Sequence, residues 1–142
     1  MKVRVRLLSG EQLPTYQTKG AVAFDVAAAQ KTIIPARSLG YVPTGLVVEV
    51  PEGYALLLCA RSSTPKKKGL LIPHGVGLID QDYCGPEDEL LVQYYNFTDA
   101  DVVVDAGERC AQGLFVRIGV AEFEESDELA SASRGGFGST GS

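Results

Sequence analysis

The segment Ala60-Arg61-Ser62-Ser63-Thr64 has the residue types needed to bind an anion. It directly follows an apolar run, residues 54–59, and offers a guanidinium, three hydroxyl groups and several backbone amides at the start of a short helix. Such donors suit a phosphate group. An ordinary helix-capping cluster without a ligand would use the same residue types. The segment alone leaves both interpretations open.

The segment Ile79-Asp80-Gln81-Asp82-Tyr83-Cys84-Gly85 ends another apolar run. If it continues as a strand, Asp80 and Asp82 point to one side and Gln81 points to the other. Close carboxylates on a rigid hairpin can hold a water molecule or a metal ion, and the Tyr83 ring offers a flat face for stacking. The alternative is a polar turn, because Asp is common in turns.

A third polar group opens a later apolar run at Gly107-Glu108-Arg109-Cys110-Ala111-Gln112. Arg109 and Gln112 fall on opposite faces if that strand is regular. Asp25 stands between Phe24 and Val26, and burying a lone carboxylate costs several kcal/mol unless a cation pairs with it. We expect Arg109 to be that partner.

The C-terminal segment 133–141 joins a cation, an aromatic ring and two hydroxyl groups on a glycine-rich chain that could close over a phosphorylated ligand. It is not a Walker loop, since no lysine precedes Ser139 and Thr140. The alternatives are a disordered tail, or an RGG-like segment that binds single-stranded nucleic acid through Arg134 and Phe137.

The sequence lacks the residue patterns needed for a serine or cysteine nucleophile activated by histidine, and for a protein-held zinc ion. His74 is the single histidine, no Gly-x-Ser-x-Gly elbow accompanies it, and we interpret it as a surface contact. Three widely spaced cysteines, Cys59, Cys84 and Cys110, argue against a disulfide framework or a zinc site and suit a reducing cytoplasm. A metal ion would then be held largely by substrate phosphates, which points to Mg²⁺.

The elements that must position these residues show a two-residue periodicity, as in Val3, Val5 and Leu7 alternating with arginines. With turn residues between short apolar runs, this predicts an all-β sandwich or barrel. Further strands are expected at 24–28, 32–34, 46–50, 54–60, 70–72, 77–79, 90–97, 102–104 and 110–118. One helical turn is expected over 64–69, with Thr64 as N-cap, Pro65 in the first turn and Gly69 as its end.

Length and charge limit the function classes. The 142 residues fit a single domain, 1–142, whose acidic and glycine-rich end from about residue 124 we expect to be a mobile arm. Thirteen Lys and Arg against eighteen Asp and Glu give a net charge of −5, which disfavours a duplex nucleic-acid partner. The N-terminus alternates charged and apolar residues, so we expect no secretory or membrane-spanning segment.

The order of these segments resembles the trimeric deoxyuridine triphosphate nucleotidohydrolases, the dUTPases, whose five short motifs occur in the same order along chains of about this length. The third and fifth matching segments are long and specific. The five segments are Phe24-Asp25 with the alanines after it, Arg61-Ser62-Ser63, Gly77 to Gly85, Gly107 to Gln112, and Arg134 to Gly141.

The resemblance implies a subunit with a jelly-roll-like distorted β-barrel, a homotrimer with active sites between subunits, and hydrolysis of dUTP to dUMP and pyrophosphate with Mg²⁺. Asp80 would be the general base that orients a water molecule for in-line attack on the α-phosphorus. Tyr83 would pack on the deoxyribose. Asp25 and Arg109 would support the groups that touch the substrate.

The resemblance also implies three sets of substrate contacts. Phosphates would be held by Arg61, Ser62, Ser63 and Gln112. The uracil edge would be read by backbone groups of Gly77, Leu78 and Ile79. In the arm, Phe137 would stack on uracil, with Arg134, Gly138, Ser139 and Thr140 contributing around the terminal phosphates.

Three positions depart from the family pattern. Val22-Ala23 stands where Ala-Gly is usual, about three extra residues occur around Pro86-Glu87-Asp88, and His74 replaces an Asn that touches the base in bacterial members. The related dCTP deaminases share the fold and an Arg-Ser-Ser segment and are the nearest alternative. A non-enzymatic single-strand-binding β-barrel with an RGG-like tail, or a trimeric structural protein, are alternatives from other classes.

Overall fold

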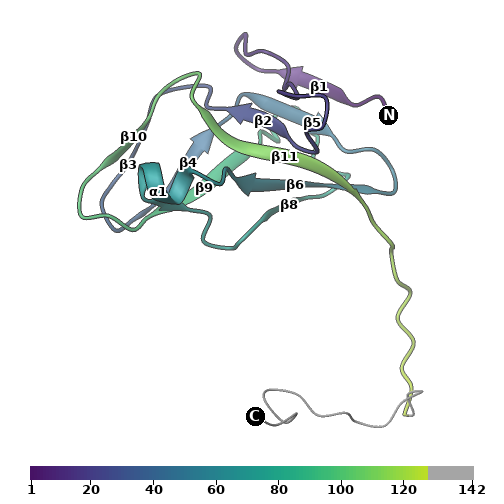
Figure 1. Ribbon diagram of the computed structural model, residues 1–142. Coiled ribbons are helices and arrows are strands. Elements are labelled where there is room, and N and C mark those ends of the chain that lie inside the picture. Colours follow the sequence, from purple (N-terminus) through teal and green to yellow (C-terminus); the bar gives the residue numbers. More distant parts are fainter. Residues whose placement is uncertain (128–142) are drawn as a thin grey trace.

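The computed structural model describes residues 1–127, which form short antiparallel strands and one helical turn (Figure 1). The strands are β1 (Arg4–Leu7), β2 (Phe24–Ala27), β3 (Thr32–Ile34), β4 (Leu39–Pro43), β5 (Leu46–Glu49), β6 (Tyr54–Ala60), β7 (Leu70–Leu71), β8 (Gly77–Ile79), β9 (Leu91–Asn96), β10 (Val102–Val104) and β11 (Arg109–Arg117). The helix is α1 (Thr64–Lys68). The predicted all-β fold is confirmed.

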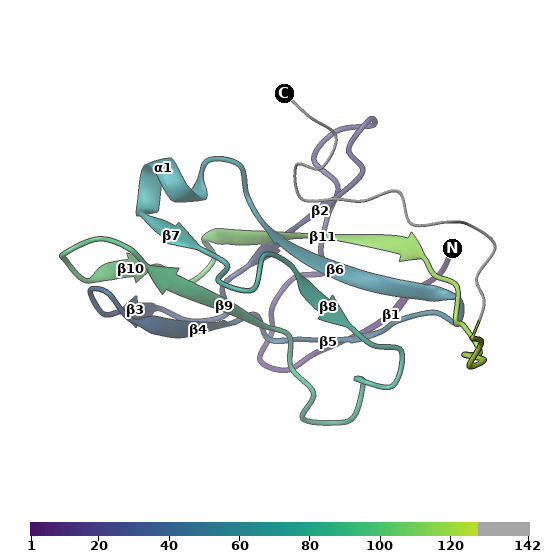
Figure 2. The ribbon, with the colours of Figure 1, turned by 90° about the horizontal axis from the view of Figure 1, so that it is seen from below.

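The strands pair in four small sheets. One has the order β2-β11-β6-β8 and another the order β4-β9-β7, while β1 pairs with β5 and β3 pairs with β10. In Figure 2, α1, β3 and β10 lie toward one end of the molecule, and the tip of β8 points away from α1. The long strands β11 and β6 therefore connect the two ends.

A single apolar core lies between the sheets. Alternate residues of the strands face it, as the two-residue periodicity requires, and Val26, Ile34, Leu56 and Val92 are fully buried there. The ring of Phe24 lies over Gly113, its partner in the β2–β11 pair, and a Cβ added there would lie 2.4 Å from Cζ of the ring. Only glycine at this position leaves room for the ring on this face of the sheet.

Most strand boundaries agree with the sequence to within a residue or two, but β4 was not predicted. Its run Leu39-Gly40-Tyr41-Val42-Pro43 contains Gly and Pro, both of which weaken a sequence-based strand assignment. An added Cβ on Gly40 would lie 3.0 Å from Cγ1 of Ile34, a tight contact, so the close packing against β3 favours glycine.

The helical turn was placed correctly, but its N-cap was not. Ser63, not Thr64, is the N-cap residue, and Thr64 is buried within the first turn. Gly69 ends the helix in the left-handed region at φ 67°. An added Cβ there would lie 2.1 Å from Cγ2 of Thr98, so two separate constraints select glycine.

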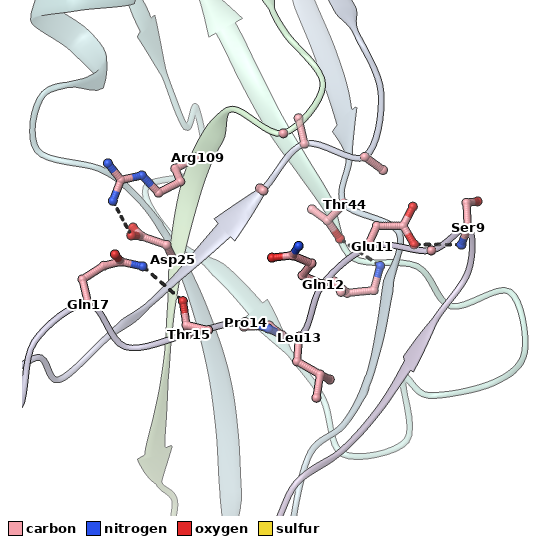
Figure 3. Close-up of a pocket in the computed structure, with 16 residues that line it drawn as sticks. Ser9, Glu11, Gln12, Leu13, Pro14, Thr15, Gln17, Asp25, Thr44 and Arg109 are labelled. Atoms are coloured by element: carbon pink, nitrogen blue, oxygen red, sulfur yellow. Dashed lines mark hydrogen bonds and ion pairs between the residues drawn. The ribbon is translucent and has the colours of Figure 1, made fainter.

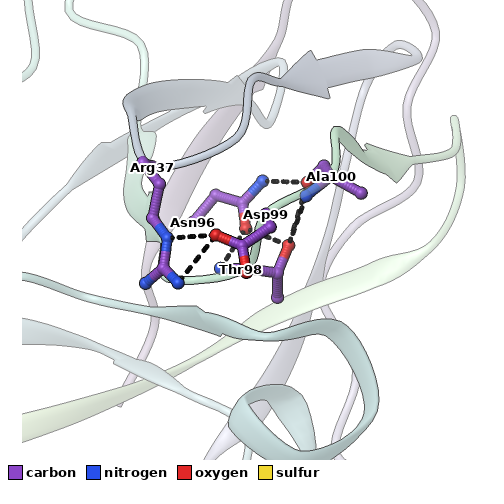
Figure 4. Close-up of polar contacts among 5 residues, drawn as sticks. All are labelled: Arg37, Asn96, Thr98, Asp99 and Ala100. Atoms are coloured by element: carbon purple, nitrogen blue, oxygen red, sulfur yellow. Dashed lines mark hydrogen bonds and ion pairs between the residues drawn. The ribbon is translucent and has the colours of Figure 1, made fainter.

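The loop after β9 is fastened by side-chain hydrogen bonds (Figure 4). The buried Asn96 amide donates to the carbonyls of Ile34 at 3.0 Å and Ala100 at 2.8 Å, and its oxygen accepts from Thr98 N at 2.9 Å. Arg37, at φ 54°, donates from Nε to Asp99 at 2.9 Å. The bonds of Asn96 satisfy backbone groups of the loop at Thr98 and Ala100, and the bond of Arg37 adds a link between side chains.

After β11 the chain leaves the body, and residues up to 127 form neither helix nor strand (Figure 1). The predicted single domain and mobile arm remain predictions, since most of the arm falls outside the described residues. Within residues 1–127, no helix is long and apolar enough to cross a bilayer.

Candidate active site

The Asp25 carboxylate is held between two arginines. Its Oδ2 lies 3.0 Å from Nη1 of Arg109, as drawn in Figure 3, and its Oδ1 lies 3.2 Å from Nε of Arg61. The Asp25 side chain is only 14% exposed, and the two cations compensate its charge. The predicted pairing with Arg109 is confirmed, whereas the pairing with Arg61 was missed.

Three neighbouring strands bring this group together. Asp25 lies on β2, Arg109 begins β11, and Arg61 follows the last residue of β6. Asp25 and Cys59 lie directly opposite Gln112 on its two sides, so these three side chains share a sheet face. The missed contact joins strands that are not adjacent, which periodicity along one strand cannot reveal.

A β-bulge changes the expected orientation of Arg109. Arg109 pairs with Ala27, but Ala111 pairs with Val26, so Cys110 is an extra residue in β11. In a regular strand Arg109 and Gln112 would face opposite sides, but the bulge turns Arg109 onto the face of Asp25 and Gln112. The opposite-face expectation, which assumed a regular strand, is therefore wrong.

The polar groups after β6 are available for a ligand. Gln112 Nε2 donates to the carbonyl of Ala60 at 3.2 Å, which ties β11 to the end of β6. Ser63 is the N-cap, yet its hydroxyl makes no capping hydrogen bond. Ser62 is exposed. The capping alternative for Ser63 is therefore not supported by the structure.

A pocket of about 510 Å³ adjoins this cluster (Figure 3). Asp25 and Arg109 line one side, and the loop of residues 9–17 lines the other, with Thr15 O accepting from Asp25 N at 3.2 Å. The loop carries no recognisable motif in its mixed polar sequence and was not among the predicted site residues.

A second groove, of about 360 Å³, lies between β8 and β9. Gly77 sits against Leu58, where an added Cβ would lie 3.2 Å from Leu58 Cβ. His74 is exposed, and its Nδ1 lies 2.8 Å from the carbonyl of Val76. Since a carbonyl only accepts, Nδ1 carries the hydrogen in this contact. The outer edge of β8 pairs with no strand among residues 1–127.

Asp80 directly follows β8, and the chain then turns. Since β8 ends at Ile79, Asp80 and Asp82 do not share a strand, and the expectation that they point the same way on one is wrong. Both carboxylates are exposed, whereas Gln81 is half-buried and its side chain donates a hydrogen bond to the carbonyl of Tyr54 at the start of β6.

The ring of Tyr83 is fixed by its hydroxyl, which donates to the carbonyl of Glu89 at 3.0 Å. The Glu89 carboxylate in turn accepts from Gly45 N at 2.6 Å. Between them, Asp88 accepts from Gly85 N at 2.6 Å. The extra residues thus form a closed turn that carries the anchor of Tyr83.

Asp80 and Arg61 lie at opposite ends of β6. Ile79 pairs with Leu56 near the start of that strand, and Arg61 follows its last residue. Continuing the register places Asp80 opposite Ala55, six residues from Arg61, which is about 20 Å along an extended strand. One chain therefore brings together Asp25, Arg61, Arg109 and Gln112 but leaves Asp80 and Tyr83 apart from them.

The predicted contacts of Arg134, Phe137, Gly138, Ser139 and Thr140 lie outside the described residues. They remain predictions from the sequence.

Comparison with known proteins gives one family. The dUTPase family model matches residues 10–141. The chain is 38% identical over 136 residues to the deoxyuridine 5'-triphosphate nucleotidohydrolase of Lactococcus lactis, covering 94% of this chain and 90% of that protein. It resembles the crystal structure of a Streptococcus mutans dUTPase, with 36% identity, a TM-score of 0.78 and coverage of 84% and 98%. It also resembles the Staphylococcus bacteriophage 80alpha dUTPase with dUPNHPP, with 26% identity, a TM-score of 0.87 and coverage of 99% and 98%.

Proposed function

The chain belongs to the dUTPase family, and we propose that its hydrolysis of dUTP to dUMP and pyrophosphate takes place at sites shared between copies of the chain. The observation that carries the proposal is the separation of Asp80 from Arg61 by the length of β6. A base acting at the α-phosphorus and a guanidinium holding the phosphates must reach the same triphosphate. A site that uses both takes Asp80 from one copy and Arg61 from another.

Arg61, Ser62, Ser63 and Gln112 form the phosphate-holding side of the site. The two arginines and one carboxylate of the Asp25 cluster leave a net positive charge, which suits a triphosphate. Asp25 holds both guanidinium groups in place before the substrate arrives. This preorganisation is the support that we assign to Asp25 and Arg109.

Asp80 supplies the base. Its carboxylate is exposed at the end of a short, paired strand, where it accepts a proton from a water molecule. The water oxygen attacks the α-phosphorus, the bond from that phosphorus to the bridging oxygen breaks, and pyrophosphate leaves in line with the attack.

Uracil lies in the groove between β8 and β9. Backbone groups of Gly77, Leu78 and Ile79 on the free edge of β8 offer N–H and C=O groups to the imide edge, and His74 lines the same groove. Cytosine presents an acceptor at N3 and a donor at position 4, where uracil presents a donor and an acceptor, so its binding leaves polar groups of the site unpaired. Tyr83, fixed through Glu89, packs on the deoxyribose and leaves no room for a 2'-hydroxyl group.

Magnesium enters with the substrate. Residues 1–127 contain no group of three His, Cys, Asp or Glu side chains placed to hold a metal, so phosphate oxygens are its main ligands. When bound, the ion offsets negative charge on the phosphates. Three free cysteines are consistent with a cytoplasmic setting, which we also propose.

A homotrimer is supported by apolar surface that the chain itself leaves uncovered. Leu39, Tyr41, Leu71 and Leu91 lie on the outer face of the β4-β9-β7 sheet and are each more than a third exposed. Beyond β11, Val120 and Phe123 are 90% and 95% exposed. A contiguous apolar face of this kind marks an interface.

The segment after β11 leads toward the arm. In our proposal the arm of a neighbouring copy closes the site, with Phe137 on the uracil ring and Arg134, Gly138, Ser139 and Thr140 at the terminal phosphates. That closure would exclude bulk water.

The test is release of pyrophosphate from dUTP compared with dTTP, dCTP and UTP, with Mg²⁺ and with EDTA. We expect dUTP to be preferred by about four orders of magnitude over dCTP, as for sites whose buried polar groups a wrong substrate leaves unpaired. Release of ammonia from dCTP, without pyrophosphate from dUTP, would instead identify a deaminase. Equal turnover of all four nucleotides would contradict the proposed base groove.

A further inference from the structure

Gln81 ties the turn that carries Asp80 to the start of β6. Its Nε2 donates to the carbonyl of Tyr54 at 3.0 Å. Of the five residues from Asp80 to Cys84, it is the only one that is not exposed. Its side chain is thus directed toward β6, whereas that of Asp80 is exposed.

This side-chain hydrogen bond extends the pairing of β6 with β8 beyond the end of their backbone ladder. That ladder pairs Leu58 with Gly77 and ends with Leu56 opposite Ile79. Two steps further, the same register places Gln81 opposite Tyr54. The backbone has already turned away there, and the side-chain amide of Gln81 supplies the donor that a strand N–H would otherwise give to the Tyr54 carbonyl.

Asp80 is therefore held from both sides. The ladder fixes Ile79 before it, and the amide of Gln81 fixes the chain after it. The other bonds of the turn are made farther along or are weaker: the Tyr83 hydroxyl donates to Glu89 O at 3.0 Å, Tyr83 N reaches Asp80 O at 3.4 Å, and the weak donor Cys84 Sγ reaches Gln81 O at 3.7 Å. The Tyr54 end is firm, because Tyr54 pairs with Arg117 of β11 and its hydroxyl accepts from Arg117 Nε at 3.2 Å.

We propose that Gln81 is a positioning residue for the reaction, which holds the Asp80 carboxylate where it can take the proton from the attacking water. This inference rests on the proposed role of Asp80. A base displaced by a fraction of an ångström still allows substrate to bind but slows the chemical step. Loss of the Gln81 contact should consequently lower kcat while KM changes little.

The test uses the full-length protein and the substitution Gln81→Met, which keeps the length of the side chain and removes its donor. We expect kcat for dUTP to fall about tenfold while KM stays within about twofold, as for a misplaced catalytic group. Gln30→Met makes the same change at an exposed glutamine outside the site and should leave both constants unchanged. Gln81→Lys retains a donor of sufficient reach and should recover most of kcat, measured at the plateau of its pH profile.

A double-mutant cycle separates positioning from general loosening. If Gln81 acts through Asp80, adding Gln81→Met to Asp80→Asn leaves the residual kcat unchanged. A kcat for Gln81→Met within twofold of the original, or the same further loss in the Asp80→Asn background, would overturn the inference. If the Gln81→Met chain does not fold, Gln81→Glu replaces it, because a carboxylate keeps the shape and polarity of the side chain but has no N–H to donate. The same changes in kcat would then support or overturn the inference. If the unaltered protein releases no pyrophosphate from dUTP, or Asp80→Asn keeps its kcat, the proposed function fails instead.

Discussion

Nε of Arg61 lies 3.2 Å from Oδ1 of Asp25, although their strands, β6 and β2, are separated in the sheet by β11. We assign the Arg61 guanidinium to the phosphates, and this contact holds it in place. The Asp25 carboxylate that makes the contact is itself mostly buried. Arg109 completes the arrangement from β11. The local charge at this end of the sheet is thus set by one acidic and two basic side chains.

Asp25→Asn should weaken both stability and substrate binding. The amide keeps the shape but leaves two guanidinium groups without their counter-charge, and we expect the free energy of unfolding to fall by about 1–3 kcal/mol. KM for dUTP should rise, because Arg61 is no longer held. Urea denaturation and initial rates measure the two effects. Asp99→Asn is the matched control: its pair with Arg37 is exposed, with side-chain exposures of 57% and 89%, and should give no measurable change.

Asp80→Asn should keep the fold and the affinity for a non-hydrolysable dUTP analogue. Without the base, kcat should fall by roughly 10²–10⁴. Calorimetric titration with the analogue and a pyrophosphate assay separate binding from chemistry. Near-normal turnover in this variant would remove Asp80 from the role of base.

Mixed trimers test whether each site takes Asp80 and Arg61 from different copies. Asp80→Asn chains and Arg61→Ala chains, each inactive alone, are co-expressed with different tags. A site works when its Asp80 comes from an Arg61→Ala chain and its Arg61 from an Asp80→Asn chain, so random mixing should restore about a quarter of the sites. Mixed trimers without activity would place both groups of one site on the same chain.

Tyr83→Ala should narrow the preference for dUTP over UTP. The ring is held by the hydrogen bond from its hydroxyl to the Glu89 carbonyl, so its removal opens space for a 2'-hydroxyl group. The ratio of kcat/KM for dUTP and UTP measures the effect. Tyr83→Phe is the companion variant, because it keeps the ring and removes only the hydroxyl that bonds to Glu89. Its preference for dUTP over UTP should fall between those of the unaltered protein and Tyr83→Ala. An unchanged ratio in Tyr83→Ala would assign the discrimination to another residue.

Stability should fall at alkaline pH because of Cys110. Burial raises the pKa of this thiol to about 12, and burial likewise raises the pKa of the neighbouring Tyr94 hydroxyl. A raised folded-state pKa gives stability that is complete below the unfolded value and is lost as pH rises toward the folded one. Between the unfolded value near pH 9 and pH 10.5, Cys110 should cost about 2 kcal/mol.

Urea denaturation at pH 8 and pH 10.5, at fixed protein concentration, measures this loss. Cys110→Ala is less stable at pH 8 but should lose less between the two pH values. In the native protein, Cys110 should also resist alkylation under conditions in which the exposed Cys84 reacts. If the unaltered protein and Cys110→Ala lose the same free energy of unfolding between pH 8 and pH 10.5, the assignment to Cys110 is contradicted.

The sequence predicts most strands correctly because a half-buried strand repeats every two residues, and this pattern is visible wherever turn residues bound it. The run over β4 is missed because Gly40 and Pro43 read as turn residues when their neighbours are unknown. Ser63 is the N-cap instead of Thr64 because the first residue of a helix depends on how the chain leaves β6.

The polar segments themselves, and the need of Asp25 for a cation, follow from residue types alone, because a carboxylate in an apolar strand needs a compensating charge. The structure confirms Arg109, the partner that was expected. Only the tertiary structure decides that Arg61 joins that pair, since its strand meets β2 through β11. Likewise, the bulge at Cys110 decides that Arg109 and Gln112 share a face. Sheet order also places Asp80 and Arg61 at opposite ends of β6, because antiparallel pairing runs β8 back toward the start of that strand. Local pattern reports which face a residue occupies, whereas distances between residues far apart in the chain depend on strand order, register and bulges.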